Sequence, residues 1–448
     1  MTLLKKTGVV LLLLLVAGMT IVPCVSAADE VSDTKYNKQT EAYNPIIVFE
    51  ELSKNDPIVD DYQDLNVPKT IKKFDVISID MEKIRENLKT GQQISIRIDG
   101  KPYKMNLKEI QVNAEGVSPE TRSYSGFLDD VKNSEIVLTV SDVIMIGRFS
   151  IDNVDYIIDT CQSSDQKGSA KTIQYVYSSA DVAEEGEYIM GDEYSTLLKN
   201  RLLTTKINED YLTTIIPESD AQAVASNTWV RILVMTDNQW ITSEPDWQTK
   251  AQNIIAEANN QLTRSDIQVQ LIAIYDSSKR YELSNDYPNI INDPLGTFYS
   301  HVPASYLNGQ SADIAIYLGG YDATCNAIGA TYGYDASSSN ARRYAWAQMA
   351  DDPSPHDAVH HDRAVVAMHE IGHMFDADHQ SAPGQSTSYN RAHEWTEWVI
   401  YTYQTVVYAP PMKSTRYEYS SDNYHGDVNH DNARRIYETR GVVANYVS

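Results

Sequence analysis

The stretch Ala364–His379 constrains this chain more than any other, because it combines an apolar run with histidines at fixed spacing. It contains the pattern H-E-x-x-H at His369, Glu370 and His373, and a third histidine, His379, follows six residues later. The apolar residues that lead into the pattern predict a largely buried helix. Positions i and i+4 share one face of a helix, so His369 and His373 can aim their imidazoles at one point.

Two neutral imidazoles on one helical face provide half of a typical zinc site. Glu370 lies about 100° around the helix from His369. It would therefore flank the metal instead of binding it, in the position of a general base for a metal-activated water. The pattern predicts Zn²⁺ as the cofactor, His369 and His373 as ligands, and Glu370 as the catalytic residue.

A third ligand requires the chain to reverse direction. His379 cannot join the other two if the helix continues straight, so the helix must end and the chain must fold back. The usual device is a glycine in the left-handed conformation three residues after the second histidine. That position holds Asp376. Aspartate tolerates the left-handed region at modest cost, so we expect the reversal there.

This spacing resembles the metzincin clan of zinc metallopeptidases, whose pattern is H-E-x-x-H-x-x-G-x-x-H. The sequence matches it at all three histidines and at Glu370, and departs from it at Asp376. The resemblance implies that His379 is the third zinc ligand and that the chain hydrolyses peptide bonds in protein or peptide substrates.

Another class of zinc peptidase remains an alternative. In gluzincins the third ligand is a glutamate on a separate helix further along the chain. Glu394 and Glu397 lie near the required distance. The choice between His379 and one of these glutamates therefore depends on the fold.

The second half of the chain alternates strand and helix patterns, which predicts an α/β or α+β fold with a mostly parallel sheet. A further segment, Ala327–Tyr334, is expected to form an antiparallel edge strand above the site. In metzincins that edge holds the substrate backbone as an added strand. The predicted strands are Trp229–Thr236, Val269–Tyr275 and Ala312–Leu318, and the predicted helices are Asp246–Leu262 and, more weakly, Leu295–Leu307.

The segments before and after the predicted helix that contains H-E-x-x-H, here called the zinc helix, lead to further predictions. Before it, His356, His360 and His361 offer a second metal site or, in the favoured interpretation, a solvated loop with Asp362 capping the helix. After it, the segment from Tyr419 to Arg434 resembles the tail and final helix of metzincins, which predicts a C-terminal helical subdomain. Metzincins have a methionine-containing turn beneath the zinc. In this sequence either Met412 is that methionine or Val407 takes its place beneath the metal.

The first half of the chain predicts a β-rich domain. Strand patterns occur at Ile94–Ile98, Tyr103–Leu107, Ile136–Val140, Ile144–Phe149 and Val154–Ile158. Short turns separate them, which indicates a β-meander or a small sandwich. The segment Tyr124–Ile158 resembles part of the prodomain of reprolysin-like (adamalysin-type) metallopeptidases. The resemblance implies a zymogen, with residues 29–226 as prodomain and linker and residues 227–448 as the catalytic domain. A permanently attached binding domain is the alternative.

The N-terminus has the features of a secretory signal peptide. Lys5 and Lys6 precede an apolar run, and small residues end it near Ala28. We therefore expect residues 1–28 to be removed and the protein to be extracellular. Two cysteines then remain, Cys161 and Cys325, so the fold is not built on disulfides. Cys161 could block the zinc as a thiolate, pair with Cys325, or stay inert.

The charge balance limits the partners. The 448 residues contain 37 Lys and Arg against 62 Asp and Glu, a net charge of −25. Such a chain repels nucleic acid and anionic lipid, so neither is expected as a partner. No later stretch is apolar enough for a membrane span. The function predicted is a secreted zinc endopeptidase, and the alternative is a non-catalytic, zinc-stabilised extracellular binding module. The sequence does not indicate cleavage preference or oligomeric state.

Overall fold

The first half of the chain forms an antiparallel meander. In this computed structural model, residues 46–51, 65–182 and 227–447 are described, apart from short gaps at 48, 92, 99–100, 153, 165–169, 326, 335–339, 351–358, 381–388, 398–400, 410–415 and 424. The predicted signal peptide, residues 1–28, and residues 183–226, where the predicted prodomain and linker end, lie outside the described residues. Pro45–Ser448 belong to one compact unit.

Ten strands of the described residues make up the N-terminal sheet, in the order β1-β4-β5-β6-β7-β8-β9-β10-β3-β2. From β4 to β10 each strand pairs antiparallel with the next, which confirms the predicted meander. The strands are β1 (Ile46–Ile47), β2 (Phe49–Glu51), β3 (Asp75–Ile79), β4 (Ile94–Ile98), β5 (Lys101–Ile110), β6 (Arg122–Leu128), β7 (Glu135–Val140), β8 (Met145–Ile151), β9 (Val154–Ser164) and β10 (Ala170–Ser178).

One helix that the sequence analysis missed, α2 (Met81–Thr90), follows β3. The Asp80 side chain accepts a hydrogen bond from the backbone N–H of Lys83, and Gly91 ends the helix in the left-handed conformation. These are ordinary start and stop signals, and they fix a short helix whose Ile84 is buried beside the sheet.

The second half contains a five-stranded sheet in the order β12-β11-β13-β15-β14. The first four strands are parallel, and β14 pairs antiparallel with β15 at the edge. The mostly parallel sheet with an antiparallel edge strand is therefore as predicted. Its strands are β11 (Thr228–Thr236), β12 (Val269–Tyr275), β13 (Ile314–Gly319), β14 (Gly329–Thr331) and β15 (Tyr344–Gln348).

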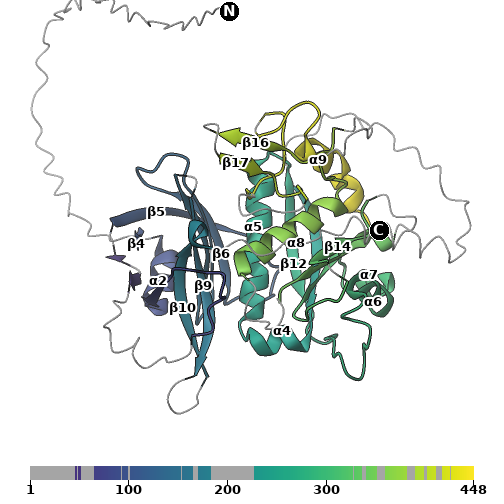
Figure 1. Cartoon of the computed structure of the whole chain (residues 1–448), viewed down its shortest axis with the longest axis horizontal. Coiled ribbons are helices and arrows are strands. Elements are labelled where there is room, and N and C mark those ends of the chain that lie inside the picture. Colours follow the sequence, from purple (N-terminus) through teal and green to yellow (C-terminus); the bar gives the residue numbers. More distant parts are fainter. Residues whose placement is uncertain are drawn as a thin grey trace, which may run out of the picture. The chain divides into compact units, whose positions relative to one another are not determined.

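Helices lie against this sheet, and Figure 1 shows α8 (His360–Met374) passing alongside β14. The long helix α5 (Trp247–Arg264) buries Ile254, Ile255 and Leu262 in the same core as α8. The predicted helix at Leu295–Leu307 is two helices, α6 and α7, because Pro303 separates them. The helices are α4 (Asn238–Ser243), α5, α6 (Pro294–His301), α7 (Ala304–Gly309), α8 (His360–Met374) and α9 (Asn432–Val443).

Buried ion pairs link two strands of the N-terminal sheet to helix α5. Arg148 of β8 contacts Glu257 of α5 at 2.9 Å, and Lys250 of α5 contacts Asp159 of β9 at 3.1 Å. The side chains of these four residues are at most 4% exposed. Each charge depends on its partner, because an unpaired charge at such a depth is strongly unfavourable. Among the described residues, no helix combines the length and apolar character needed to cross a membrane.

Candidate metal centre

Helix α8 carries two of the three predicted ligands. His369 is buried and His373 is partly buried, one turn apart on the same face. The Nδ1 atom of His369 donates to the carbonyl of Val406 at 2.9 Å, and Nδ1 of His373 donates to the carbonyl of Ala377 at 2.7 Å. Because Nδ1 carries the hydrogen in each neutral ring, each Nε2 has a free lone pair. Backbone carbonyls thus fix the orientation and the tautomer of both rings.

The helix ends in a turn that returns the chain toward these rings. Asp376 has φ = 70°, which confirms the predicted left-handed residue. The backbone N–H of Ala377 donates to the carbonyl of Gly372, and the N–H of Asp376 donates to the carbonyl of His373, both at 3.1 Å. This pair of hydrogen bonds is the Schellman arrangement of a helix end.

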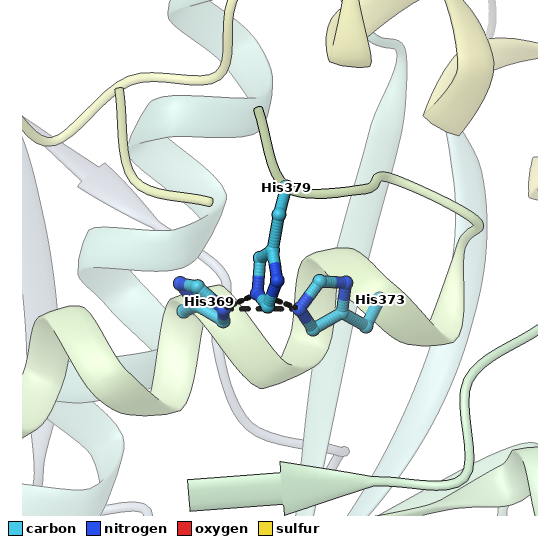
Figure 2. Close-up of side chains that lie close together, drawn as sticks. All are labelled: His369, His373 and His379. Carbon is cyan, nitrogen blue, oxygen red and sulfur yellow. Dashed lines mark hydrogen bonds between the residues drawn. The ribbon is translucent and has the colours of Figure 1, made fainter. Parts of the chain in front are cut away.

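The turn brings His379 to the other two histidines. The Nε2 atoms are 2.8 Å apart for His369 and His379, 2.9 Å for His369 and His373, and 3.0 Å for His373 and His379. Figure 2 shows the three rings pointing toward one another. The prediction that the chain reversal gathers the three imidazoles is therefore confirmed.

The donor set fits a cation such as Zn²⁺. Burial, together with the nearby His373 and His379, lowers the pKa of His369 well below its usual range, so that its ring is neutral. With their Nδ1 atoms donating to backbone carbonyls, His369 and His373 each bring an Nε2 lone pair to the point where the three rings meet. Lone pairs this close repel one another, and a divalent metal ion that accepts nitrogen ligands would satisfy them.

Glu370 is a residue of α8, and its side chain lies against the edge strand β14. Its side chain is 2% exposed. A Cβ atom added to Gly329, the first residue of β14, would lie 2.6 Å from Oε1 of Glu370. The absence of a side chain at Gly329 therefore makes room for the carboxylate beside the backbone of the edge strand. Sequence analysis did not single out Gly329, although it falls in the predicted edge segment.

The floor of the site is apolar. Val407 is fully buried, and its Cγ2 atom would lie 3.1 Å from a Cβ atom added to Gly372. Tyr419 approaches the same glycine, and its hydroxyl donates to the carbonyl of Met368 at 3.0 Å. Val407 thus packs against α8 at Gly372, the residue before His373. Met412 lies outside the described residues.

The gluzincin alternative expects a helix that carries Glu394 and Glu397, and the structure contradicts that helix. Both residues lie in a strand, β16 (Glu394–Glu397), which pairs with β17 (Tyr401–Gln404). Glu394 is exposed and accepts a hydrogen bond from Gln404 at 3.1 Å. In the described part of the chain, the cluster of candidate ligands at α8 contains the three histidines and no glutamate.

Two of the expectations for Cys161 are wrong for this structure. Cys161 and Cys325 are both free, so they do not form a disulfide. Cys161 is buried in an apolar cluster with Tyr175 and Val359, and burial raises the pKa of its thiol to about 12. Among the described residues, the candidate cluster at α8 contains no cysteine, so Cys161 is not placed to block a metal there. The inert thiol is the alternative that fits.

The favoured interpretation of the histidines before the zinc helix is also wrong. His360 and His361 are buried within the first turn of α8 instead of lying in a solvated loop. The N-cap is Val359, and Asp362 lies inside the helix without capping it. The imidazole of His361 contacts the hydroxyl of Tyr417 at 2.6 Å, which explains a histidine there without a metal. His356 lies outside the described residues.

One comparison with known proteins returns a family model whose match covers this part of the chain. The family model described as metallo-peptidase family M12 matches residues 226–409, a range that includes all three histidines and Glu370. No curated protein matches the sequence.

Two solved structures show weak similarity. A chaperone–substrate complex has 14% identity and a TM-score of 0.36, and covers 50% of this chain and 35% of its own. A crystal structure of metalloproteinase-II from Bacteroides fragilis has 13% identity and a TM-score of 0.39, and covers 79% of this chain and 96% of its own. This chain thus spans about a third of the first structure, and both similarities are too low for a functional argument. The family match supports a metallopeptidase in the part of the chain from 226 to 409.

Proposed function

We propose that this protein is a secreted zinc-dependent endopeptidase of the metzincin type, made as a reprolysin-like zymogen. Residues 1–28 would be the signal peptide, 29–226 the prodomain with its linker, and 227–448 the catalytic domain. The observation that carries the proposal is the meeting of three imidazoles at one point, on a helix whose Glu370 carboxylate lies against the edge strand at Gly329.

His369, His373 and His379 would hold the zinc through their Nε2 atoms. Bound there, Zn²⁺ would act as a Lewis acid toward the scissile carbonyl and the attacking water. Glu370 takes a proton from that water and passes it to the leaving amine. An extended peptide would add to the free edge of β14, which places its backbone beside the glutamate.

Replacing the proposed base separates chemistry from metal binding. We expect Glu370→Gln to keep the zinc content of the parent and to lose cleavage of a protein substrate by a factor of at least about 10². The amide has nearly the same shape as the carboxylate, so the fold should be retained. If Glu370→Gln cleaved the substrate at the parental rate, Glu370 would not be the general base.

The binding-module alternative makes a different prediction for the parent protein. Incubation with casein, with and without a metal chelator, distinguishes the two functions. An endopeptidase produces internal fragments that disappear when the chelator is present and return when zinc is restored. Intact casein in every sample, from a protein with a full zinc site, would favour the binding module. The presence of a carboxylate at Glu370 favours the enzyme, because metal binding alone does not require it.

Secretion and maturation are tested by the N-terminus of the protein recovered from the culture medium. A start near Asn227, determined by mass spectrometry, would support a zymogen that is cut in the segment Pro217–Asn227. A start near Asp29 would support an N-terminal domain that remains part of the chain. Recovery of the protein only inside the cells would contradict the proposed signal peptide.

A further inference from the structure

A second group of metal-ligating side chains lies outside the site at α8. His393, Asp427 and His430 each offer one ligand atom, and these atoms lie within 4.8 Å of one another. His393 precedes β16, whereas Asp427 and His430 belong to the loop between Tyr419 and α9. The cluster therefore joins two segments that are distant in sequence, and neither segment belongs to the H-E-x-x-H pattern.

The loop presents its two ligands in a fixed arrangement. Asp427 and His430 exchange backbone hydrogen bonds of 3.2 and 2.9 Å. Nδ1 of His430 donates to Oδ1 of Asp427 at 2.8 Å. A Cβ atom added to Gly426 would lie 2.3 Å from the carbonyl oxygen of His430, so only glycine fits this turn. The carboxylate and the imidazole are thus already held side by side.

We propose that His393, Asp427 and His430 form a second binding site, for a divalent transition-metal ion such as Zn²⁺, Co²⁺ or Ni²⁺. Two imidazoles and one carboxylate are a ligand set that these ions accept, whereas Ca²⁺ and Mg²⁺ prefer oxygen ligands. Coordination through Nδ1 of His430 requires its hydrogen to move to Nε2 of the same ring. Oδ1 of Asp427 then becomes available as a neighbouring ligand.

Hydrogen bonds connect this second site to the segments that orient two ligands of the first. The N–H of His393 donates to Oγ1 of Thr405 at 2.9 Å, and the N–H of Thr405 donates to the carbonyl of His393 at 3.0 Å. Thr405 precedes Val406, whose carbonyl holds His369.

On the other side, the loop leads from His430 to Asn432. The side chain of Asn432 accepts a hydrogen bond from the N–H of Asp378 at 3.1 Å. Asp378 precedes His379. An ion at the second site would therefore stiffen the segments that orient His369 and His379, which identifies its role as structural support for the first site.

Metal stoichiometry tests the proposal without relying on peptidase activity. The full chain is stripped with a chelator, titrated with Zn²⁺ and separately with Co²⁺, desalted, and assayed for bound metal. We expect two equivalents in the parent and one in His393→Ala, in His430→Gln and in Asp427→Asn. His373→Ala, which disables the first site, should also keep one. His301→Ala, which changes a histidine of α6, should keep two.

Thermal unfolding gives a second measurement that is independent of the first site. In a His373→Ala background, Zn²⁺ should raise the unfolding temperature, and adding His393→Ala or Asp427→Asn should abolish that rise. Asp427→Asn keeps an acceptor for the turn, so it controls for misfolding of the histidine variants. One equivalent in the parent, or two equivalents retained in both His393→Ala and Asp427→Asn, would overturn the proposal. Failure of peptidase activity alone would not affect either measurement.

Discussion

Arg435 of α9 forms an ion pair with Asp376, the left-handed residue that turns the chain from His373 toward His379. Nε of Arg435 donates to Oδ2 of Asp376 at 2.6 Å, and Nη2 lies 2.5 Å from the same oxygen. The side chain of Asn390 donates to the Asp376 carbonyl at 2.7 Å. The position where metzincins place a glycine thus carries a side chain that is held from the C-terminal helix. The two side chains are 15% and 28% exposed, so the pair is shielded from solvent for the most part.

This relationship predicts that Arg435→Gln weakens zinc binding. Without the guanidinium, Asp376 keeps the strain of φ = 70° and loses the contact that offsets it. We expect a loss in zinc affinity of about 10-fold or more, the range typical for residues that support metal ligands. Competition with a chromophoric chelator measures that affinity.

The control is the double variant Asp376→Gly/Arg435→Gln. Glycine adopts the left-handed conformation without strain, so it should restore most of the affinity that Arg435→Gln loses. The single change Asp376→Gly should have little effect. Equal zinc affinities for the parent and for Arg435→Gln would show that the ion pair does not position His379.

A second prediction concerns the space beside Glu370. In Gly329→Ala, the new Cβ would lie 2.6 Å from Oε1 of Glu370 and 2.7 Å from Cγ1 of Val366, so the carboxylate must move. We expect kcat for peptide cleavage to fall about 10- to 100-fold while zinc content stays unchanged, because small displacements of a positioned group cost that much. Gly309→Ala is the matched control, since nothing lies within 4 Å of its added Cβ. If Gly329→Ala had the same kcat as the parent, the edge strand would not be needed to position Glu370.

The sequence predicts the ligand positions well because they depend on local geometry. The i and i+4 spacing places His369 and His373, and the need for a third ligand places the reversal at Asp376. The partners that hold these residues come from elsewhere in the chain, and nothing local identifies them. Val406, Gly329 and Arg435 reach the site only through the sheet order and the packing of the C-terminal segment.

The predictions from sequence that are wrong also have physical causes. The strand β15 was missed because it is short and buried at all five positions, so its sequence YAWAQ shows no alternation. The segment at Glu394 looked helical, but it pairs as a hairpin through β17. His360 and His361 looked solvated because they are polar, whereas the contact with Tyr417 allows His361 to be buried. Sequence patterns do not reveal such distant partners.

A third prediction concerns acid stability. Burial lowers the pKa of both His360 and His361 from 6.5 to about 4. The unfolded chain therefore binds protons more readily than the folded one between these values. The contribution of these two neutral histidines to the free energy of unfolding is fully present above pH 6.5 and is lost as the pH falls toward 4. The loss is up to about 3 kcal/mol per histidine, at about 1.4 kcal/mol per pKa unit.

Urea unfolding of chelator-treated protein between pH 7.5 and pH 4 measures this dependence. Removing the metal excludes the pH dependence of metal binding, and the three histidines at α8 are present in both proteins, so their protonation is common to the two profiles. We expect His361→Gln to be less stable than the parent at pH 7.5, because it loses the fit to Tyr417, and to have a shallower decline toward low pH. His301→Gln should follow the parental profile. Parallel profiles for the parent and His361→Gln would contradict a buried neutral imidazole at this position.

The last prediction concerns the attachment of the N-terminal sheet to the C-terminal half of the chain. Arg148 lies between Glu257 and Asp155, at 2.9 and 3.3 Å, and Lys250 contacts Asp159. Backbone hydrogen bonds also cross this interface, where Ala273 of β12 donates to Val112 at 2.7 Å and accepts from Ala114 at 2.9 Å. Val112 and Val137 share an apolar core with the residues of α5. Such an interface is expected to persist without a covalent connection.

We therefore expect cleavage of the linker not to release the N-terminal part. A site for a specific protease inserted after Pro217 should yield two fragments that elute together in size-exclusion chromatography, even at high salt, because buried pairs are screened little. Arg148→Met removes one partner of a buried pair, which costs about 3–5 kcal/mol, and should allow the cleaved fragments to separate. Arg434→Met is the control, since Arg434 is 56% exposed in its pair with Glu438. Separation of the parental fragments would show that a cut in the linker is sufficient for release.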